Sequence, residues 1–247
     1  METDRLKIIN GDMMKYIAII PMAIGHFVSY MQTAGVITNM TWWMNVLAYG
    51  SLFAPVIFFF FITEGFKYTR SKKKYALRLL IFAVITQFPY CLASNGTLLT
   101  SKLFLDLNVI FTLFFGLITL MAWESGWKLH VRIIAVIFID VLTCVLGCEW
   151  MIFGVLIILG LHIFRDNSKA RFIWFFVSVF CLNFIMNGLV LSMTFWVGWL
   201  IQMLAYFLMV KCYNGKRGKH PNIAKWFFYI FYPLHFVIIY IAQIILA

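Results

Sequence analysis

The chain has 247 residues, of which 64% are hydrophobic and 12% are charged, whereas soluble domains are about half apolar and about a quarter charged. This composition excludes an ordinary water-soluble domain and favours a protein that lies in a membrane. The formal net charge of +11 does not indicate nucleic-acid binding, because Lys and Arg lie almost entirely between the apolar runs. The five Cys lack metal-ligand and redox-motif spacing, so we expect packing roles for them and no bound metal.

Nine apolar runs follow one another along the chain, at about 16–37, 46–66, 76–93, 107–123, 131–147, 150–164, 172–190, 192–210 and 226–247. A membrane-spanning helix needs about 17–25 apolar residues, and the fifth and sixth runs are the least certain by this measure. The sequence predicts an all-α, polytopic bundle of about nine transmembrane helices. No repeat or linker divides it, so we predict one transmembrane domain over residues 1–247.

The distribution of Lys and Arg predicts the orientation of this bundle. If the N-terminus lies in the cytoplasm and the runs alternate, only Lys102 of the 20 Lys and Arg falls outside. Removing either short run would place a basic loop on the wrong face. We therefore predict a multi-pass membrane protein with its N-terminus inside and its C-terminus outside.

Ionisable side chains within these runs are candidates for function, because they are costly to place in hydrocarbon. They are His26, Glu64, Arg78, Asp140 and His235, and Asn108 and Thr112 add uncharged polarity. Asp140 and His235 also fit a second interpretation, in which neighbouring helices satisfy them as packing residues.

Lys15 and His26 are related by helical spacing. Eleven residues of helix advance about 16 Å and complete almost three full turns, which places both side chains on one helix face. This arrangement suits a ligand with an anionic head and a long arm that ends in a reactive group. The alternative is that Lys15 anchors the helix at the membrane surface and His26 makes a hydrogen bond between helices.

Two basic loops have the composition of phosphate-binding sites. The first is 69–74 (TRSKKK), with Arg78 beyond it, and the second is 214–219 (NGKRGK). Both also fit a role in topology or in binding lipid head groups. Glu64 is expected to be stabilised by Arg70 or Arg78, and it is either a site residue or only the structural partner of these cations.

Lys15 and His26, within residues 6–31, resemble the first helix of the TraX family, membrane proteins named for the acetylase that modifies the N-terminus of F-pilin. The same lysine-to-histidine spacing occurs in the wider acyltransferase-three group of transmembrane acyltransferases. Further similar segments follow in the family's order, at 55–78 (PVIFFFFITEGFKYTRSKKKYALR), 87–90 (QFPY), 108–113 (NVIFTL), 154–156 (GVL), 213–218 (YNGKRG) and 231–235 (FYPLH). Together they cover about 220 residues.

The chain departs from the family pattern at Gly25, where the family usually carries Asp immediately before the histidine. If that Asp assists the histidine, Gly25→Asp is expected to raise turnover, provided that the carboxylate fits. Asp140 is a possible substitute. The departure also keeps open a catalytically altered member of the family.

The resemblance implies a multi-pass protein of the bacterial plasma (inner) membrane. It also implies transfer of an acetyl group from cytoplasmic acetyl-CoA to an acceptor in or across the membrane. The implied catalytic residues are His26, as general base, with Asp140 and His235. The implied donor-binding residues are Lys15, Glu64, Arg70, Lys74, Arg78, Asn108, Thr112, Asn214, Arg217 and Tyr232. The acceptor would be a pilin-like or other peptide, a glycan or a small molecule, and nucleic acid is not an expected partner. The alternatives are a proton-coupled transporter and a non-catalytic assembly scaffold.

Overall fold

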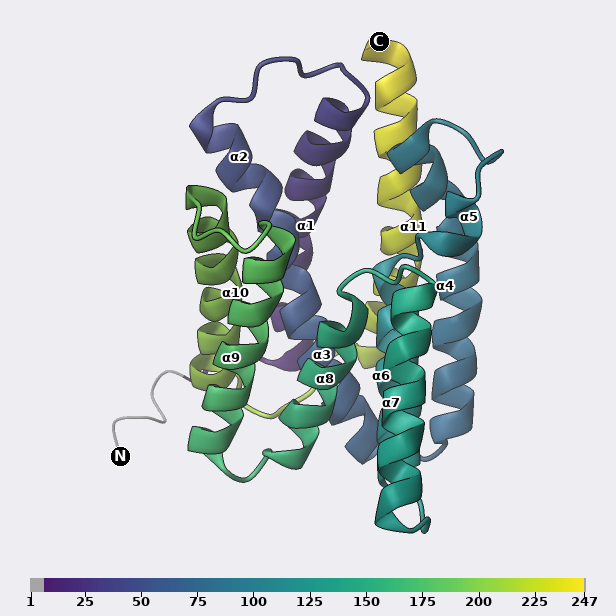
Figure 1. Ribbon diagram of the computed structural model, residues 1–247, viewed down its shortest axis with the longest axis vertical. Coiled ribbons are helices and arrows are strands. Elements are labelled where there is room, and N and C mark those ends of the chain that lie inside the picture. The colour runs from purple at the N-terminus through teal and green to yellow at the C-terminus, as the bar shows by residue number, and fades with distance from the viewer. Residues whose placement is uncertain (1–6, 247) are drawn as a thin grey trace. The chain divides into compact units, whose positions relative to one another are not determined.

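The computed structural model describes residues 7–246, and the regular elements in that range are helices (Figure 1). They are α1 (Gly11–Thr33), α2 (Trp42–Tyr49), the 3-10 turn η2 (Gly50–Leu52), α3 (Phe53–Tyr68), α4 (Lys72–Asn95), α5 (Lys102–Leu105), α6 (Val109–Trp123), α7 (Leu129–Val145), α8 (Met151–Ile163), α9 (Ser168–Met186), α10 (Met193–Cys212) and α11 (Pro221–Leu246). Ile9 pairs with Tyr213, and Leu107 with Cys148, in isolated bridges of extended chain. The predicted all-α class is confirmed.

Six helical segments are long and apolar enough to cross a membrane, as expected of a multi-pass membrane protein. They are Gly11–Thr33, Trp42–Tyr68, Lys72–Asn95, Ser168–Met186, Met193–Cys212 and Asn222–Leu246. The helices α6, α7 and α8 contain 15, 17 and 13 residues, at or below the minimum of about 17 residues for a span. They coincide with the fourth, fifth and sixth predicted spans, so helix length alone does not support the predicted number of nine.

The described chain forms two compact units, and each is described separately. The first unit comprises residues 7–57, 89–97 and 187–246, and therefore contains α1, α2, η2, α10 and α11 with the adjoining ends of α3 and α4. The second comprises residues 58–88 and 98–186 and contains α5 to α9 with the remaining parts of α3 and α4.

Helix α1 organises the first unit. The side chain of Asn10 caps its start by accepting hydrogen bonds from the backbone N–H groups of Asp12 and Met13. One face is buried at helical spacing, at Gly11, Met14, Ala18, Met22, Gly25, Val28 and Met31. Apolar side chains on its other face are exposed, as expected for a surface that faces lipid: Met13, Ile17, Ile20, Ile24 and Phe27. The first span is therefore one-sided, with small residues on the packed side.

In the second unit, glycines allow α6, α8 and α9 to pack closely. A Cβ at Gly116 would overlap the side chain of Ile158, and a Cβ at Gly160 would overlap the indole of Trp174. The indole N–H of Trp174 donates a hydrogen bond to the carbonyl of Leu156 at 2.9 Å. Much of α6 and α8 is consequently buried against protein, whereas α7 exposes an apolar stripe at Ile134, Ile137, Phe138, Val141 and Val145.

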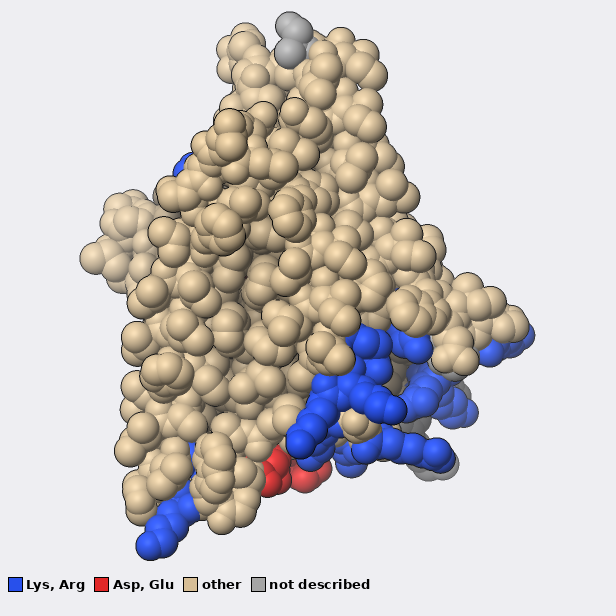
Figure 2. Space-filling view, turned by 90° about the vertical axis from the view of Figure 1, so that its right-hand side faces the viewer, with Lys and Arg blue, Asp and Glu red and all other residues tan. Residues whose placement is uncertain are grey.

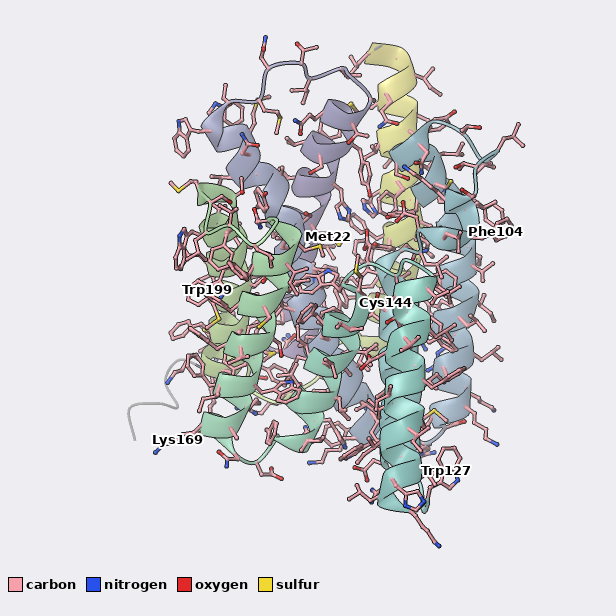
Figure 3. All side chains as sticks on the ribbon, in the orientation of Figure 1. Met22, Phe104, Trp127, Cys144, Lys169 and Trp199 are labelled. Atoms are coloured by element: carbon pink, nitrogen blue, oxygen red, sulfur yellow. The ribbon has the colours of Figure 1, made fainter. Side chains whose placement is uncertain are left out.

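Within the second unit, Lys and Arg lie at one end of the helices. The end of α3 meets the end of α8 through a ring contact between Phe66 and His162 at 5.4 Å, and α4 begins beside it. Figure 3 shows Lys169 and Trp127 at this same end of the unit and Cys144 towards the other. Among the described Lys and Arg of this unit, Lys102 is the exception, because it lies at the start of α5, beyond the other end of α4. Figure 2 shows one face of the protein, most of which carries no charged residue, with its Lys and Arg mainly in the lower half and towards the right.

The first unit has the same asymmetry. Residues 9–11 pair with residues 212–216 through backbone hydrogen bonds, from Ile9 N–H to the Cys212 carbonyl at 3.0 Å and from Gly11 N–H to the Lys216 carbonyl at 2.9 Å. These bonds hold the start of α1 beside the basic loop between α10 and α11. In each unit, the basic loops lie at one end of the helices, as they would if all of them face the same side of the membrane.

Labelling with a membrane-impermeant thiol reagent in intact cells is expected to reach Leu99→Cys and not Lys73→Cys, in a background without other cysteines. Lys73 lies at the start of α4, and Leu99 lies in the loop just beyond its other end and is 96% exposed. Breaking the cells provides the control, because Lys73→Cys should then react. Labelling of Lys73→Cys in intact cells would reverse the predicted orientation.

Candidate functional site

Two histidines from opposite ends of the sequence meet in the first unit. Nδ1 of His26, on α1, lies 2.9 Å from Nε2 of His235, on α11, which is hydrogen-bond distance. The ring centroids are 5.2 Å apart and the rings are inclined by 19°. The two histidines predicted as catalytic candidates are therefore direct partners.

Aromatic rings surround this histidine pair. His26 stacks on Phe236 with centroids 5.2 Å apart and meets the edge of Tyr30 at 5.8 Å. His235 stacks on Phe231 at 5.7 Å and contacts Tyr232 at 5.0 Å. The residues on α11 recur at intervals of three and four, so they line one face of the helix. Tyr232, which the resemblance implied as a donor-binding residue, thus lies beside His235.

The basic end of the first unit is built by the loop at 213–218. The Asn214 side chain accepts a hydrogen bond from Lys216 N–H at 2.9 Å, and Gly215 has φ +74°, a left-handed conformation that glycine adopts without strain. The loop lies close to Asp12, because a Cβ at Gly218 would overlap the Asp12 carboxylate. Asn214 therefore shapes the loop that presents Arg217.

Lys15 lies at this same end. It interacts electrostatically with Asp12 and Arg217, and its Nζ lies 5.8 Å from the ring centroid of Phe228 on α11. Lys15 and His26 are eleven residues apart on α1, or about 16 Å along the helix axis. One compact unit thus contains a cationic end and a histidine pair joined by a single helix.

Gly25 has no room for the carboxylate that the resemblance led us to expect at this position. The backbone of residues 47–51 lies directly on it: a Cβ at Gly25 would overlap Ser51 N and lie 2.8 Å from the Ala48 carbonyl oxygen. Real Cβ atoms essentially never come this close to backbone. The expectation that Gly25→Asp raises turnover depended on the carboxylate fitting, and it is therefore wrong for this chain.

Glu64 has a partner that the sequence analysis did not single out. In the second unit its carboxylate accepts a hydrogen bond from the guanidinium of Arg165 and forms an ion pair with it. Arg70 and Arg78 were the expected partners, whereas the ion pair described here comes from Arg165, because the end of α8 lies beside the end of α3. The only signal in the sequence was that Arg165 follows an apolar run directly.

The other predicted phosphate-binding residues of the second unit lie near the start of α4. Arg70 and Lys74 are exposed. The backbone N–H of Lys74 donates a hydrogen bond to the Ser71 hydroxyl at 3.3 Å. The Arg78 guanidinium lies 5.7 Å from the ring centroid of Tyr75. Exposure leaves Arg70 and Lys74 accessible to an anionic ligand, and their role as donor contacts stays a prediction.

Asn108 and Thr112 are fully buried and their polar groups bond within the protein. The Asn108 amide donates to the Ala83 carbonyl at 3.0 Å and to the Gln87 side chain at 2.8 Å, and its oxygen caps Ile110 N–H. The Thr112 hydroxyl donates to the Glu149 carbonyl. These bonds tie α4, α6 and the loop before α8 together. The structure thus shows a structural role for both residues, and their predicted contact with the donor gains no support from it.

Asp140 lies on α7, in the second unit, whereas the histidine pair lies in the first. Oδ1 of Asp140 is buried without a hydrogen-bond partner among the described residues. Its predicted substitution for the missing carboxylate stays a prediction.

Two of the five cysteines, Cys91 and Cys148, are buried as a packing role requires, whereas Cys144 is exposed. Those at 91, 144, 148, 181 and 212 are all free thiols. Burial raises the pKa of the Cys148 thiol to about 12, and the nearby Cys144 and Glu149 raise it further. Such a thiol forms almost no thiolate near neutral pH, which argues against a nucleophilic role.

Comparison with known proteins identifies the family. The family described as "TraX protein" matches residues 10–243 of the chain. A protein of Dichelobacter nodosus described as "Probable fimbrial assembly protein FimC, serogroup H1" is 29% identical over 246 residues, which cover 94% of this chain and 95% of that relative. No solved structure matches the chain. Because the match extends over nearly the whole chain, including both histidines and both basic loops, the protein belongs to the TraX family.

Proposed function

We propose that this protein is a membrane-embedded acetyltransferase that moves an acetyl group from cytoplasmic acetyl-CoA to an amine or hydroxyl acceptor. The acceptor that the family and the relative favour is the free amine of a pilin-like or fimbrial subunit, because that relative is named for fimbrial assembly. The observation that carries the proposal is the first unit itself, which joins the cationic end at Lys15 and Arg217 to the histidine pair along α1.

The two ends of this unit suit the two ends of the donor. Phosphate groups are bound by Lys and Arg through charge-assisted hydrogen bonds, and these cations lie at one end of the unit. The acyl thioester lies at the far end of the pantetheine arm. An arm that runs along α1 would bring the thioester to His26, about 16 Å from Lys15.

Transfer needs a group that removes and returns one proton. The acceptor nitrogen or oxygen bonds to the acetyl carbonyl carbon while His26 takes its proton, and the carbonyl becomes a tetrahedral oxyanion. The carbon–sulfur bond then breaks, and the imidazolium returns the proton to the departing CoA thiolate. The products are the acetylated acceptor and free CoA thiol, and His26 is neutral again.

We also propose the topology that this chemistry needs: an inner-membrane protein with its N-terminus and basic loops in the cytoplasm and its C-terminus outside. Nine crossings keep every described basic loop on one face. The apolar stripe on α7 supports its contact with lipid, although the helix has only 17 residues. The short helices α6 and α8 are buried within the second unit, where protein rather than lipid surrounds most of their length.

A non-catalytic role in assembly is the second candidate, and the name of the relative favours it. Such a protein would hold the fimbrial subunit without consuming acetyl-CoA. Binding of acetyl-CoA to the detergent-solubilised protein separates the two, because only the enzyme needs a donor site.

Arg217→Ala is expected to weaken CoA binding by about ten- to hundredfold, since a hydrogen bond to a charged group is typically worth ~1.5–3 kcal/mol. Arg217 is exposed, so the fold should not change. Isothermal titration calorimetry with CoA measures the effect. Lys102→Ala is the control, because Lys102 is the one Lys or Arg that the charge distribution predicts to lie outside.

The same titration tests the second unit through Arg70→Ala and Arg78→Ala. Weaker binding in these variants would support their predicted phosphate contacts. Unchanged affinity in all three arginine variants would leave these residues with a role in topology alone.

A further inference from the structure

We infer that His235 is a positioning residue for His26: it accepts a hydrogen bond from Nδ1–H of His26 and so leaves Nε2 of His26 unprotonated and available to the acceptor. The inference rests on the proposed acetyl transfer. It changes the role of His235 from a competing base to the group that orients the base.

The contact itself limits the protonation states. A neutral imidazole carries one N–H, so at a separation of 2.9 Å one of the two facing nitrogens donates and the other accepts. If His26 donates from Nδ1, its Nε2 has a free lone pair. If His235 donates from Nε2, the proton of His26 lies on Nε2, and that nitrogen cannot act as a base.

The surroundings of His235 favour the first arrangement. Its Nδ1 is buried and has no hydrogen bond of good geometry among the described residues, but the backbone carbonyls of Tyr232 and Phe231 interact with the ring. Nε2 of His235 faces His26, and Nδ1 is the ring nitrogen nearer to the backbone of its own helix. A carbonyl can only accept, so the carbonyls one turn earlier favour a proton on Nδ1. Nε2 of His235 is then the acceptor, and Nδ1 of His26 is the donor.

Contacts with neighbouring aromatic rings hold both imidazole rings in this orientation. His26 lies between Phe236 and Tyr30, and His235 lies against Phe231 and Tyr232. His235 is 5% exposed, whereas His26 is half-buried. By residue surface area, the more enclosed histidine is therefore the one that we assign to orient the other.

During acetyl transfer, His26 carries the proton and His235 stabilises the charged form of His26. When Nε2 of His26 takes the proton of the acceptor, the positive charge spreads to Nδ1–H and is stabilised by the lone pair on Nε2 of His235. The proton then leaves from Nε2 of His26 to the CoA thiolate. His235 gains no proton and loses none, so its effect is on orientation and charge.

Two substitutions of His235 separate an orienting role from a packing role. In His235→Gln the side-chain oxygen reaches a position near that of Nε2 and can accept the hydrogen bond, whereas His235→Phe keeps the ring volume without an acceptor. We expect His235→Phe to lower kcat by about 10²-fold or more with little change in KM for acetyl-CoA. His235→Gln should recover kcat to within about tenfold of the wild type. Equal kcat in His235→Phe and the wild type would overturn the inference, and so would a His235→Gln variant as slow as His235→Phe.

A second measurement reads the hydrogen bond without any turnover. Nitrogen-15 NMR of protein labelled at histidine and held in detergent micelles distinguishes the two neutral tautomers, and His26→Gln assigns the His26 signals. We expect the Nδ1–H tautomer of His26 in the wild type and in His235→Gln, and a mixture in His235→Phe. An Nε2–H tautomer of His26 in the wild type would contradict the assignment. A wild type that never transfers acetyl groups would instead overturn the proposed function, while the NMR signals still decide the direction of the hydrogen bond.

Discussion

Gly25→Asp is expected to prevent α2 and η2 from packing on α1, and so to destabilise the protein rather than to improve it. A Cβ at this position overlaps backbone atoms of residues 47–51, which cannot move without shifting both elements. Overpacking typically costs about 1–3 kcal/mol, and an unpaired carboxylate in an apolar site adds several more. We expect a loss of more than about 3 kcal/mol, which exceeds the tolerance of many domains.

Thermal unfolding and size-exclusion chromatography in detergent measure this effect. Gly126→Asp is the matched control, because a Cβ at Gly126 meets nothing within 4 Å. The control should unfold near the wild-type temperature, whereas Gly25→Asp should unfold far below it or fail to accumulate. A stable, monodisperse Gly25→Asp protein with higher turnover would restore the expectation that the sequence suggested.

His26→Ala is expected to lower the rate of acetyl transfer by about 10²–10⁴-fold, the usual effect of removing a general base. Binding of CoA should be unchanged, because the cations proposed to hold its phosphates lie about 16 Å away along α1. His26→Gln, which keeps more of the side-chain volume, should be equally slow. His130→Ala is the control, since His130 is an exposed histidine at the start of α7.

Rates of acetyl transfer from radiolabelled acetyl-CoA, together with CoA titrations of the same preparations, decide this prediction. Loss of transfer with intact CoA binding supports a role at the thioester. Full turnover in His26→Ala together with loss in His235→Ala would show that His235, rather than His26, is the base.

The sequence was sufficient to predict the long helices and the gathering of Lys and Arg in loops at one end of each unit. Apolar runs in a membrane must satisfy their backbone groups internally, so each predicted run became helical. Some helix ends were harder to predict: the run at 172–190 extends past Met186, where α9 ends and the chain turns through left-handed φ angles at Gly188 and Leu189. Hydropathy does not report such local geometry.

The sequence also identified both histidines, because an ionisable group within an apolar run stands out. It did not predict that they touch. His26 and His235 are 209 residues apart, and only the packing of α11 on α1 brings them together. Their aromatic neighbours Tyr30 and Phe236 carried no separate signal in a chain with 19% aromatic residues.

The roles of Gly25 and Asn108 could not be predicted from residue type alone. The glycine was interpreted as a missing carboxylate, whereas in the structure it is the point where another backbone approaches the helix. The asparagine was interpreted as a ligand contact, yet its polar groups hold α4 and α6 together. Both features depend on what lies opposite the residue, which is a property of tertiary packing.

The most direct test of the proposed function is acetyl transfer by the wild-type protein in proteoliposomes. Radiolabelled acetyl-CoA is supplied on the face that carries the basic loops, with a synthetic peptide that has a free α-amino group as acceptor and the same peptide already acetylated as control. The account predicts labelled peptide and an equal amount of free CoA thiol, with neither product from the control peptide or from His26→Ala. Neither acetyl-CoA binding nor labelled peptide from the wild type would contradict the enzyme assignment and leave the assembly role in its place.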